Sequence, residues 1–138
     1  MLDHCLYFNT TALARQLEKQ WAKAFAPFEL TPPQAFLLRI VLDRPGLMQC
    51  EIASALAISR PTATRALDGL MAKGLIERRS SGRDGREQAI FPTAPAISMH
   101  MQLNEASGQV TRQLKKLLGA DVFADTVTKI RGVRSALK

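Results

Sequence analysis

The sequence has few cysteines, no long apolar run and no leader-like start. Its 138 residues include two Cys, too few for a disulfide framework, and free thiols suit a reducing compartment. The most apolar run, residues 35–42, is interrupted by Arg39 and is far shorter than the roughly 18 residues that a membrane span needs. Residues 1–4 lack the basic region that opens a secretory signal. We therefore expect a cytoplasmic globular protein without membrane contact, built as one domain or as one domain plus helices that need a partner.

Residue sets for metal binding and catalysis are missing as well. His4 and His100 are too few and too widely separated to form a zinc site with Cys5 and Cys50. No Ser-His-Asp set, phosphate-binding loop, dinucleotide fingerprint or carboxylate pair stands out. The sequence therefore predicts no catalytic residues, no metal and no cofactor.

Positive charge is present in excess. The formal net charge is +7 and the isoelectric point is near 10.0, while 46% hydrophobic residues indicate a chain that can fold. The excess lies in two blocks, with a net charge of +3 over residues 60–90 and +5 over residues 112–138. Such a block can bind nucleic acid, anionic lipid or acidic proteins, although a solvated face is its ordinary role. Charge alone does not choose between these partners.

Apolar residues three and four positions apart predict the first helices, over residues 6–25, 35–42, 49–56 and 60–73. Thr31 and Gln34 form a capping-box pattern before the second helix, and Ser59 is a good N-cap for the fourth. Gly74 then provides a left-handed stop. The short connection between the third and fourth helices is typical of a helix-turn-helix.

After Gly74 the apolar period changes from about 3.6 residues to two. This change predicts strands over residues 75–80 and 86–91, joined by a loop that contains Asp84-Gly85. Thr93 can cap a long helical stretch over residues 94–118, and Asp121 can open a last helix. The predicted fold is mainly α with a small antiparallel β-hairpin wing. It divides into an N-terminal dimerisation helix (1–29), a winged helix-turn-helix domain (30–93) and C-terminal dimerisation helices (94–138).

This layout is suited to duplex DNA, because a helix can enter the major groove and a basic hairpin can reach phosphates or a narrow minor groove. The exposed side of the fourth helix is short-chained near its start and carries one central Arg. The hairpin side chains include four arginines, whose planar guanidinium groups suit phosphates. The candidate DNA contacts are Arg60, Pro61, Thr62, Thr64, Arg65, Arg78, Arg79, Arg83, Asp84 and Arg86.

The sequence resembles the MarR family of winged helix-turn-helix regulators. The resemblance is carried in family order by Leu30-Thr31-Pro32-Pro33-Gln34, Ile52-Ala53, Ser59-Arg60-Pro61-Thr62-Ala63-Thr64-Arg65, Leu70-Met71-Ala72-Lys73-Gly74-Leu75-Ile76-Glu77-Arg78, Asp84-Gly85-Arg86 and Pro92-Thr93. It implies a homodimer on a pseudo-palindromic DNA operator, with each recognition helix in a major groove and each wing at a minor groove. Met48 departs from the usual Thr or Ser cap of the third helix, and Pro61 replaces a more usual polar residue.

By the same resemblance, Thr62, Thr64 and Arg65 would contact bases or backbone. Arg83 would reach the minor groove, and Arg86, oriented by Asp84, would anchor phosphate. The regulator would be a repressor relieved by a small-molecule effector or by an oxidant. Its alternatives are a winged-helix protein-interaction module and a non-specific architectural DNA binder.

The apolar sides of the terminal helices predict the dimer independently of the resemblance. Neither segment can bury its apolar side alone, and Phe25 is expected to belong to the same patch. Two-fold pairing would cover these residues and place the recognition helices about 34 Å apart. The candidate interface residues are Leu6, Leu13, Leu17, Trp21, Phe123, Ile130 and Val133.

Cys5 is the candidate redox residue, because a helix N-terminus can lower the pKa of a thiol. The start of the chain resembles the peroxide-sensing branch of the family, but the reactive Cys of that branch aligns with Tyr7. The alternative is that Cys5 is a small buried residue in the dimer interface.

Overall fold

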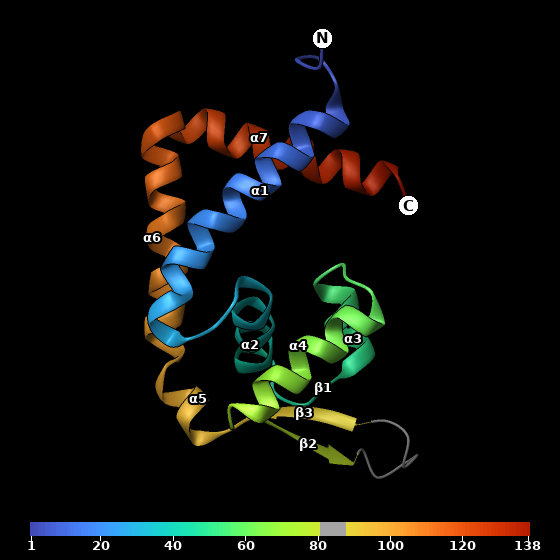
Figure 1. Ribbon diagram of the computed structural model, residues 1–138, viewed down its shortest axis with the longest axis vertical. Coiled ribbons are helices and arrows are strands. Elements are labelled where there is room, and N and C mark those ends of the chain that lie inside the picture. Colours follow the sequence, from blue (N-terminus) through green and yellow to red (C-terminus); the bar gives the residue numbers. More distant parts are fainter. Residues whose placement is uncertain (81–87) are drawn as a thin grey trace.

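The computed structural model describes residues 1–80 and 88–138 and confirms the predicted winged helix-turn-helix fold. Its elements follow one another along the chain as labelled in Figure 1. In order, they are α1 (Leu6–Phe25), the 3-10 helix η1 (Ala26–Phe28), α2 (Pro32–Asp43), β1 (Leu47–Met48), α3 (Gln49–Ala55), α4 (Arg60–Ala72), β2 (Ile76–Ser80), β3 (Gln88–Pro92), α5 (Ala94–Ser98), α6 (His100–Leu118) and α7 (Ala120–Ala136).

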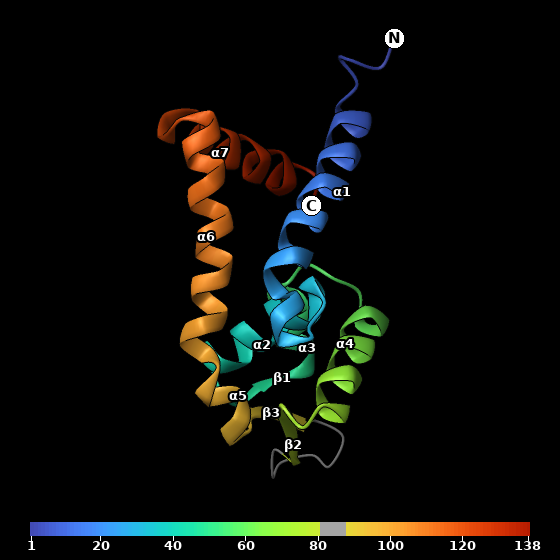
Figure 2. The ribbon, with the colours of Figure 1, turned by 60° about the vertical axis from the view of Figure 1, so that its left-hand side comes forward.

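The elements divide into two ends of an elongated molecule (Figures 1 and 2). At one end α2, α3 and α4 pack over the three-stranded sheet, and we call residues 30–93 the winged lobe. At the other end α7 lies across the far end of α6. The helices α1 and α6 pack against each other and both contact α2. We call the helices α1, α6 and α7 the terminal helices.

The core lies mainly in the winged lobe. Its fully buried side chains come from both sides of the helix-turn-helix and from the sheet, and each such apolar side chain contributes roughly 1.5–3 kcal/mol by leaving water. Phe25 of α1 and Leu103 of α6 extend this core toward the terminal helices. The largest members are Phe25, Leu37, Leu38, Val41, Ile52, Leu67, Leu70, Ile90 and Leu103.

The sheet has the antiparallel order β1-β3-β2. The hairpin pairs Arg78 with Ile90 and Arg79 with Ala89, while β1 pairs Leu47 with Ile90 on the other side of β3. The sequence did not predict β1, because two residues are too few to show an alternating pattern. The first hairpin strand begins at Ile76, one residue later than predicted, and the second runs from Gln88 to Pro92.

Three predicted helix signals are confirmed by local geometry. The Thr31 hydroxyl accepts a hydrogen bond from the Gln34 backbone N–H, and the Gln34 side chain accepts one from the Thr31 N–H, which completes the capping box. Ser59 caps α4 through its hydroxyl. Gly74 follows α4 with a φ of 70°, a conformation that glycine adopts without steric cost.

The prediction of one continuous helix over residues 94–118 is wrong, because the helix is interrupted at Met99. The backbone of Met99 has φ −96° and ψ 1°, and the Ser98 hydroxyl donates to the Pro95 carbonyl, a local bond that competes with continued helix. Thr93 does not cap α5 with its side chain; its hydroxyl donates to the Gly74 carbonyl at 2.7 Å instead. The last helix begins at Ala120, so Asp121 lies inside its first turn rather than before it.

Within the described residues, none of the helices combines the length and the apolar character that a membrane crossing requires. In the same part of the chain, His, Cys, Asp and Glu side chains do not gather into a group of three or more that could hold a metal ion.

Candidate nucleic-acid interface and effector pocket

The start of α4 presents an exposed, positively charged surface. Arg60, Pro61 and Arg65 are all exposed on it. Among the described residues, neither arginine forms an ion pair with a carboxylate. The Arg65 guanidinium reaches back to the Thr62 hydroxyl over 3.4 Å. This surface can therefore donate charge-assisted hydrogen bonds to an anionic ligand without first breaking an internal ion pair.

Thr62 and Thr64 are held by neighbouring groups rather than presented freely. The Thr62 hydroxyl lies 2.8 Å from the Ser59 hydroxyl at the N-cap. The Thr64 hydroxyl donates to the Arg60 carbonyl and accepts a 2.7 Å hydrogen bond from the Gln49 side-chain amide. Gln49 begins α3, so this contact fixes the two helices of the helix-turn-helix to each other. Sequence reasoning missed Gln49 because its partner lies 15 residues away.

Helix α3 begins without a side-chain cap at Met48, as its departure from the family pattern predicts. The Glu51 carboxylate accepts the Met48 backbone N–H at 3.2 Å instead. This places a negative charge at the start of α3, where it interacts favourably with the helix dipole. The acidic side chain also makes this helix start less suitable for a phosphate.

Arg78 has an internal partner. Its guanidinium donates to Asp68 of α4 at 2.9 Å, and its side chain is only 22% exposed. The Arg78 Nε is buried and finds no hydrogen-bond acceptor within the described residues. Arg78 therefore joins α4 to the first wing strand, β2, and a role in DNA contact would require this ion pair to open.

Arg79 lies on the wing strand, over an aromatic ring. Its guanidinium carbon is 4.1 Å from the centre of the Phe91 ring, and the side chain also pairs with Glu77. The side chain is 58% exposed, so one side of the guanidinium faces solvent. The stacking stiffens a long side chain near the loop end of β2. The remaining predicted wing residues, Arg83, Asp84 and Arg86, lie outside the described residues.

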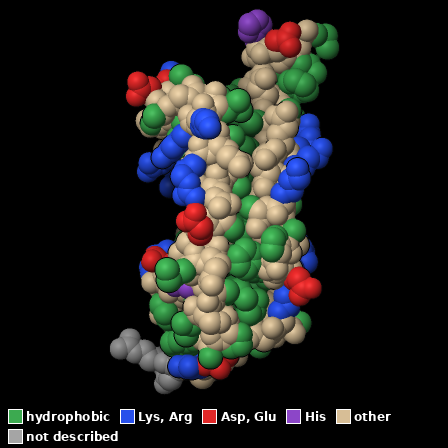
Figure 3. Space-filling view, turned by 90° about the vertical axis from the view of Figure 1, so that its left-hand side faces the viewer, with side chains coloured by type: hydrophobic (Ala, Val, Ile, Leu, Met, Phe, Trp, Pro, Cys, Tyr) green, Lys and Arg blue, Asp and Glu red, His purple; other side chains and the backbone are tan. Residues whose placement is uncertain are grey.

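The basic block of the terminal helices lies far from α4 (Figure 1). Figure 3 shows Lys and Arg side chains gathered in the half of the molecule formed by α1, α6 and α7. Several have local partners: Arg112 pairs with Glu105, Lys129 with Asp125 at 3.0 Å, and the Lys115 ammonium lies 5.4 Å from the centre of the Phe123 ring. These contacts fit the solvated outer face that the sequence predicts for this block.

The predicted dimer residues divide into two groups. Leu6, Leu13, Ile130 and Val133 are exposed by 65%, 37%, 42% and 41%, and α7 buries none of residues 120–136. By contrast, the expectation that Phe25 forms part of an exposed patch is wrong, because Phe25 is fully buried beneath α2 and meets the Phe36 ring edge-on.

The other three predicted interface residues, Leu17, Trp21 and Phe123, are partly buried within the chain itself. Trp21 packs against the core, and its indole N–H donates to Ser107. Trp21 therefore makes substantial contacts within its own chain.

A polar junction connects α2 to the terminal helices. The buried Ser107 hydroxyl of α6 accepts hydrogen bonds from the Trp21 indole at 3.1 Å and from Arg39 of α2 at 3.0 Å. Arg39 also donates to Asn104 at 2.8 Å and lies over the Phe36 ring. Burial lowers the pKa of the Arg39 guanidinium, because desolvation disfavours its charged form. Sequence reasoning missed this junction, since Arg39 and Ser107 are 68 positions apart.

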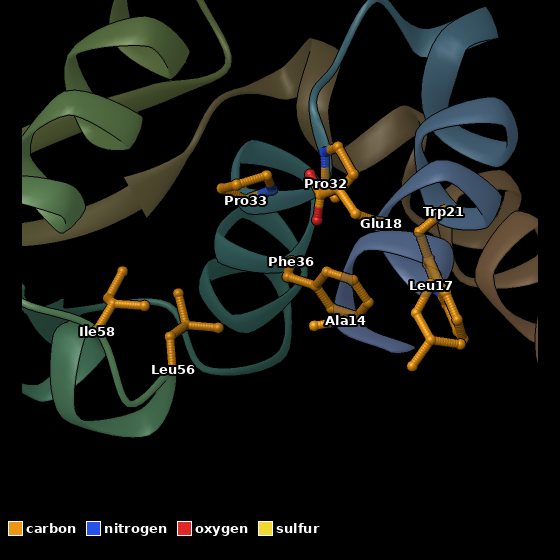
Figure 4. A pocket seen from close by; sticks show the side chains of 9 residues that line it. All are labelled: Ala14, Leu17, Glu18, Trp21, Pro32, Pro33, Phe36, Leu56 and Ile58. Atoms are coloured by element: carbon orange, nitrogen blue, oxygen red, sulfur yellow. The ribbon is translucent and has the colours of Figure 1, made fainter. Parts of the chain in front are cut away.

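Beside the junction lies a pocket of about 480 Å³ (Figure 4). It opens between α1, the start of α2 and the turn from α3 to α4. Its volume falls within the range of about 300–1,000 Å³ that is common for small-molecule sites. The lining is apolar except for one carboxylate and consists of Ala14, Leu17, Glu18, Trp21, Pro32, Pro33, Phe36, Leu56 and Ile58.

Cys5 is the N-cap of α1. Its sulfur accepts a hydrogen bond from the Phe8 backbone N–H at 3.4 Å, and the residue is half-buried. Cys50 is exposed in the first turn of α3. Both thiols are free.

Comparisons with known proteins place this geometry among DNA-binding regulators. A model described as "MarR family" matches residues 28–87. The regulator MgrA of Staphylococcus aureus is 27% identical over 93% of this chain and 95% of its own. A protein of Thauera aromatica, described as a putative transcriptional regulatory protein for the hcr operon, is 28% identical over 64% of this chain, which spans only 54% of that relative.

Among solved structures, the transcriptional repressor CouR bound to a 23-mer DNA duplex aligns with a TM-score of 0.87 and 25% identity. The alignment covers 96% of this chain and 94% of CouR. CouR bound to p-coumaroyl-CoA aligns with a TM-score of 0.86 and 24% identity, over the same shares of the two chains.

Proposed function

We propose that this chain, which belongs to the MarR family of transcriptional regulators, is a homodimeric repressor that binds a pseudo-palindromic operator and leaves it when an effector binds. The observation that carries the proposal is the exposed start of α4, where Arg60 and Arg65 stand without carboxylate partners among the described residues. The likeness to CouR, which was solved on a DNA duplex, supports the same assignment.

In this proposal the first turns of α4 enter the major groove. Arg65 is the base-reading side chain, since arginine can donate two hydrogen bonds to guanine. Arg60 and the backbone at the Ser59 cap face phosphate, which a helix N-terminus favours. Thr62 and Thr64 serve mainly to hold the helix and its neighbours in position, given the hydrogen bonds described above.

The wing is assigned a supporting role. Arg79 is exposed enough to approach the DNA backbone from the loop end of the paired strands. Arg83 keeps the minor-groove role that the family resemblance implies, and Arg86 with Asp84 keeps the phosphate anchor. Arg78 is assigned instead to holding α4 against β2 through Asp68.

The terminal helices are proposed to pair with those of a second copy. The exposed Ile130 and Val133 of α7 and Leu6 and Leu13 of α1 are the apolar residues that a partner would cover. Apolar side chains left exposed on helix faces of a folded chain commonly mark an interface. A two-fold pair would present two α4 helices to successive major grooves.

Release is proposed to occur through the pocket at the polar junction. The pocket contacts α1 on one side and the start of α2 and the α3–α4 turn on the other. A ligand seated there would touch both the terminal helices and the winged lobe, so its binding energy can bias the spacing of the two recognition helices. Oxidation of Cys5, the half-buried cap of α1, is the alternative signal acting on the same helices.

Selection of bound duplexes from a random DNA library tests the proposal. We expect a palindromic consensus with half-sites about one helical turn apart. Binding without a consensus would indicate an architectural DNA binder. Absence of binding at low salt would indicate a protein-interaction module, and either result would overturn the proposal. Repeating the selection with peroxide-treated wild type and Cys5→Ser protein tests the oxidant as the signal.

A further inference from the structure

We infer that the pocket between α1, α2 and the α3–α4 turn takes a planar aromatic cation, with Glu18 as its counter-charge. The inference rests on the proposed function, in which this pocket holds the effector, and it adds the chemical class of that effector. Two features of the pocket carry it: the flat rings of its walls and the sign of its only charged lining residue.

The walls of the pocket are flat and apolar. The Trp21 and Phe36 rings lie 6.4 Å apart, at 44° to each other, and Pro32 and Pro33 add two further rings at the start of α2 (Figure 4). Leu56 and Ile58 form the opposite side. Such a space favours a flat ring system, which can stack on the aromatic residues and bury apolar area against the others.

The charge in the pocket favours a cation. Glu18 is the one charged residue among the nine that line it, and it forms no ion pair within the described part of the chain. Arg15 and Lys19 are on the same helix but do not line the pocket. Aromatic faces attract cations as well, so Trp21 and Glu18 act in the same direction, whereas the Phe36 ring already carries the Arg39 guanidinium 5.3 Å from its centre. An anionic ligand would instead bring its charge against a carboxylate.

The Arg39 guanidinium lies near the pocket but belongs to the polar junction with Asn104 and Ser107. Arg39 lies over the Phe36 ring at 5.3 Å, but its guanidinium donates to Asn104 and Ser107 and it does not line this pocket. It lines a separate space, in which Asp43 supplies a carboxylate. Arg39 is therefore not placed to receive an anion bound beside Trp21.

The net charge of the chain does not reverse this preference. A charge of +7 draws anions toward the molecule at long range. At physiological salt, however, exposed charges are screened beyond about 8 Å. Within the pocket the contact with Glu18 decides, because Glu18 is the one charged residue among the nine that line it.

Three probes of matched shape test the inference with the full-length protein. N-methylquinolinium is cationic, quinoline is neutral near neutral pH, and 1-naphthoate is anionic. Binding is measured by calorimetry, and quenching of Trp21, the only tryptophan, reports occupancy of this pocket. We expect the cation to bind about tenfold more tightly than quinoline, and 1-naphthoate to bind most weakly.

Variants at Glu18 provide the decisive comparison. Glu18→Gln should weaken N-methylquinolinium about tenfold and leave quinoline unchanged, and Glu18→Lys should prefer 1-naphthoate. Glu105→Gln, an exposed carboxylate on α6 outside this pocket, is the control and should change neither affinity. Equal binding of the three probes, preference for the anion in the wild type, or no binding at millimolar concentration would overturn the inference.

DNA binding without probe is measured on the same preparations, so that the two proposals fail separately. Loss of all duplex binding would overturn the proposed function and leave the probe preference to be judged from calorimetry. Tight DNA binding together with an unselective pocket would overturn only the ligand class.

Discussion

The winged lobe buries most of its apolar residues, whereas helix α7 leaves most of its apolar residues exposed. In the lobe, Leu38, Leu67 and Ile90 are completely buried by other parts of the same chain. In α7, Val127, Ile130 and Val133 remain 41–42% exposed although they follow helical spacing. The lobe thus has its own core, while α7 has an apolar face that its own chain leaves open. The two regions are therefore stabilised in different ways, one within the chain and one, by our proposal, between two chains.

The largest expected effect comes from removing core volume from the lobe. Leu38→Ala should lower the free energy of unfolding by about 2–5 kcal/mol, because it removes buried methyl groups and leaves a cavity. Chemical denaturation followed by circular dichroism measures the change. Ile97→Ala, at a side chain that is 58% exposed on α5, is the control and should stay within about 0.5 kcal/mol. Equal losses for the two variants would show that the lobe core does not carry the stability.

The second-largest expected effect comes from charging the open face of α7. Ile130→Glu should dissociate the proposed dimer and weaken binding to a full operator by about 100-fold, because two linked contacts become one. Light scattering after size exclusion and gel shifts measure the two effects.

Thr128→Glu is the matched control for that variant, since Thr128 lies on the opposite side of α7 from the apolar positions. It should leave both mass and affinity unchanged. A wild type that runs as a monomer, or an Ile130→Glu protein that remains dimeric, would contradict the assigned role of α7.

The third and smallest expected effect concerns the start of α4, the surface that we propose contacts DNA. Arg65→Ala should cost about 1–3 kcal/mol of binding free energy and relax base preference at one position of each half-site. Fluorescence anisotropy on a panel of single-base operator variants measures both. Lys73→Ala is the control, because Lys73 lies at the C-terminal end of α4, and this variant should keep the base preference. Uniform weakening across the panel would make Arg65 a phosphate anchor instead.

Local signals in the sequence predicted the fold well. Thr31, Ser59 and Gly74 each mark a helix end through chemistry confined to a few neighbouring residues, so their pattern is visible without tertiary structure. The break at Met99 was not visible, because an apolar residue with no Gly or Pro beside it gives no local signal.

Contacts between distant residues could not be predicted in the same way. The sequence did not distinguish Arg78 from the other wing arginines, because its ion pair with Asp68 joins two different elements, β2 and α4. The helical spacing likewise placed Phe25 on the apolar side of α1. It could not show whether residues of its own chain or of a partner would cover Phe25. The polar junction of Arg39 with Ser107 depends on how α2 meets α6, which no local pattern encodes.

In our proposal, paired terminal helices hold two winged lobes one turn of DNA apart, an arrangement that depends on the spacing of the half-sites. It is tested most directly by inserting half a helical turn, about 5 base pairs, between the half-sites of the selected operator and measuring the affinity of the full-length protein. We expect a loss of about 100-fold, because the second α4 then faces the wrong side of the duplex. An unchanged affinity would contradict it and show that each lobe binds DNA on its own.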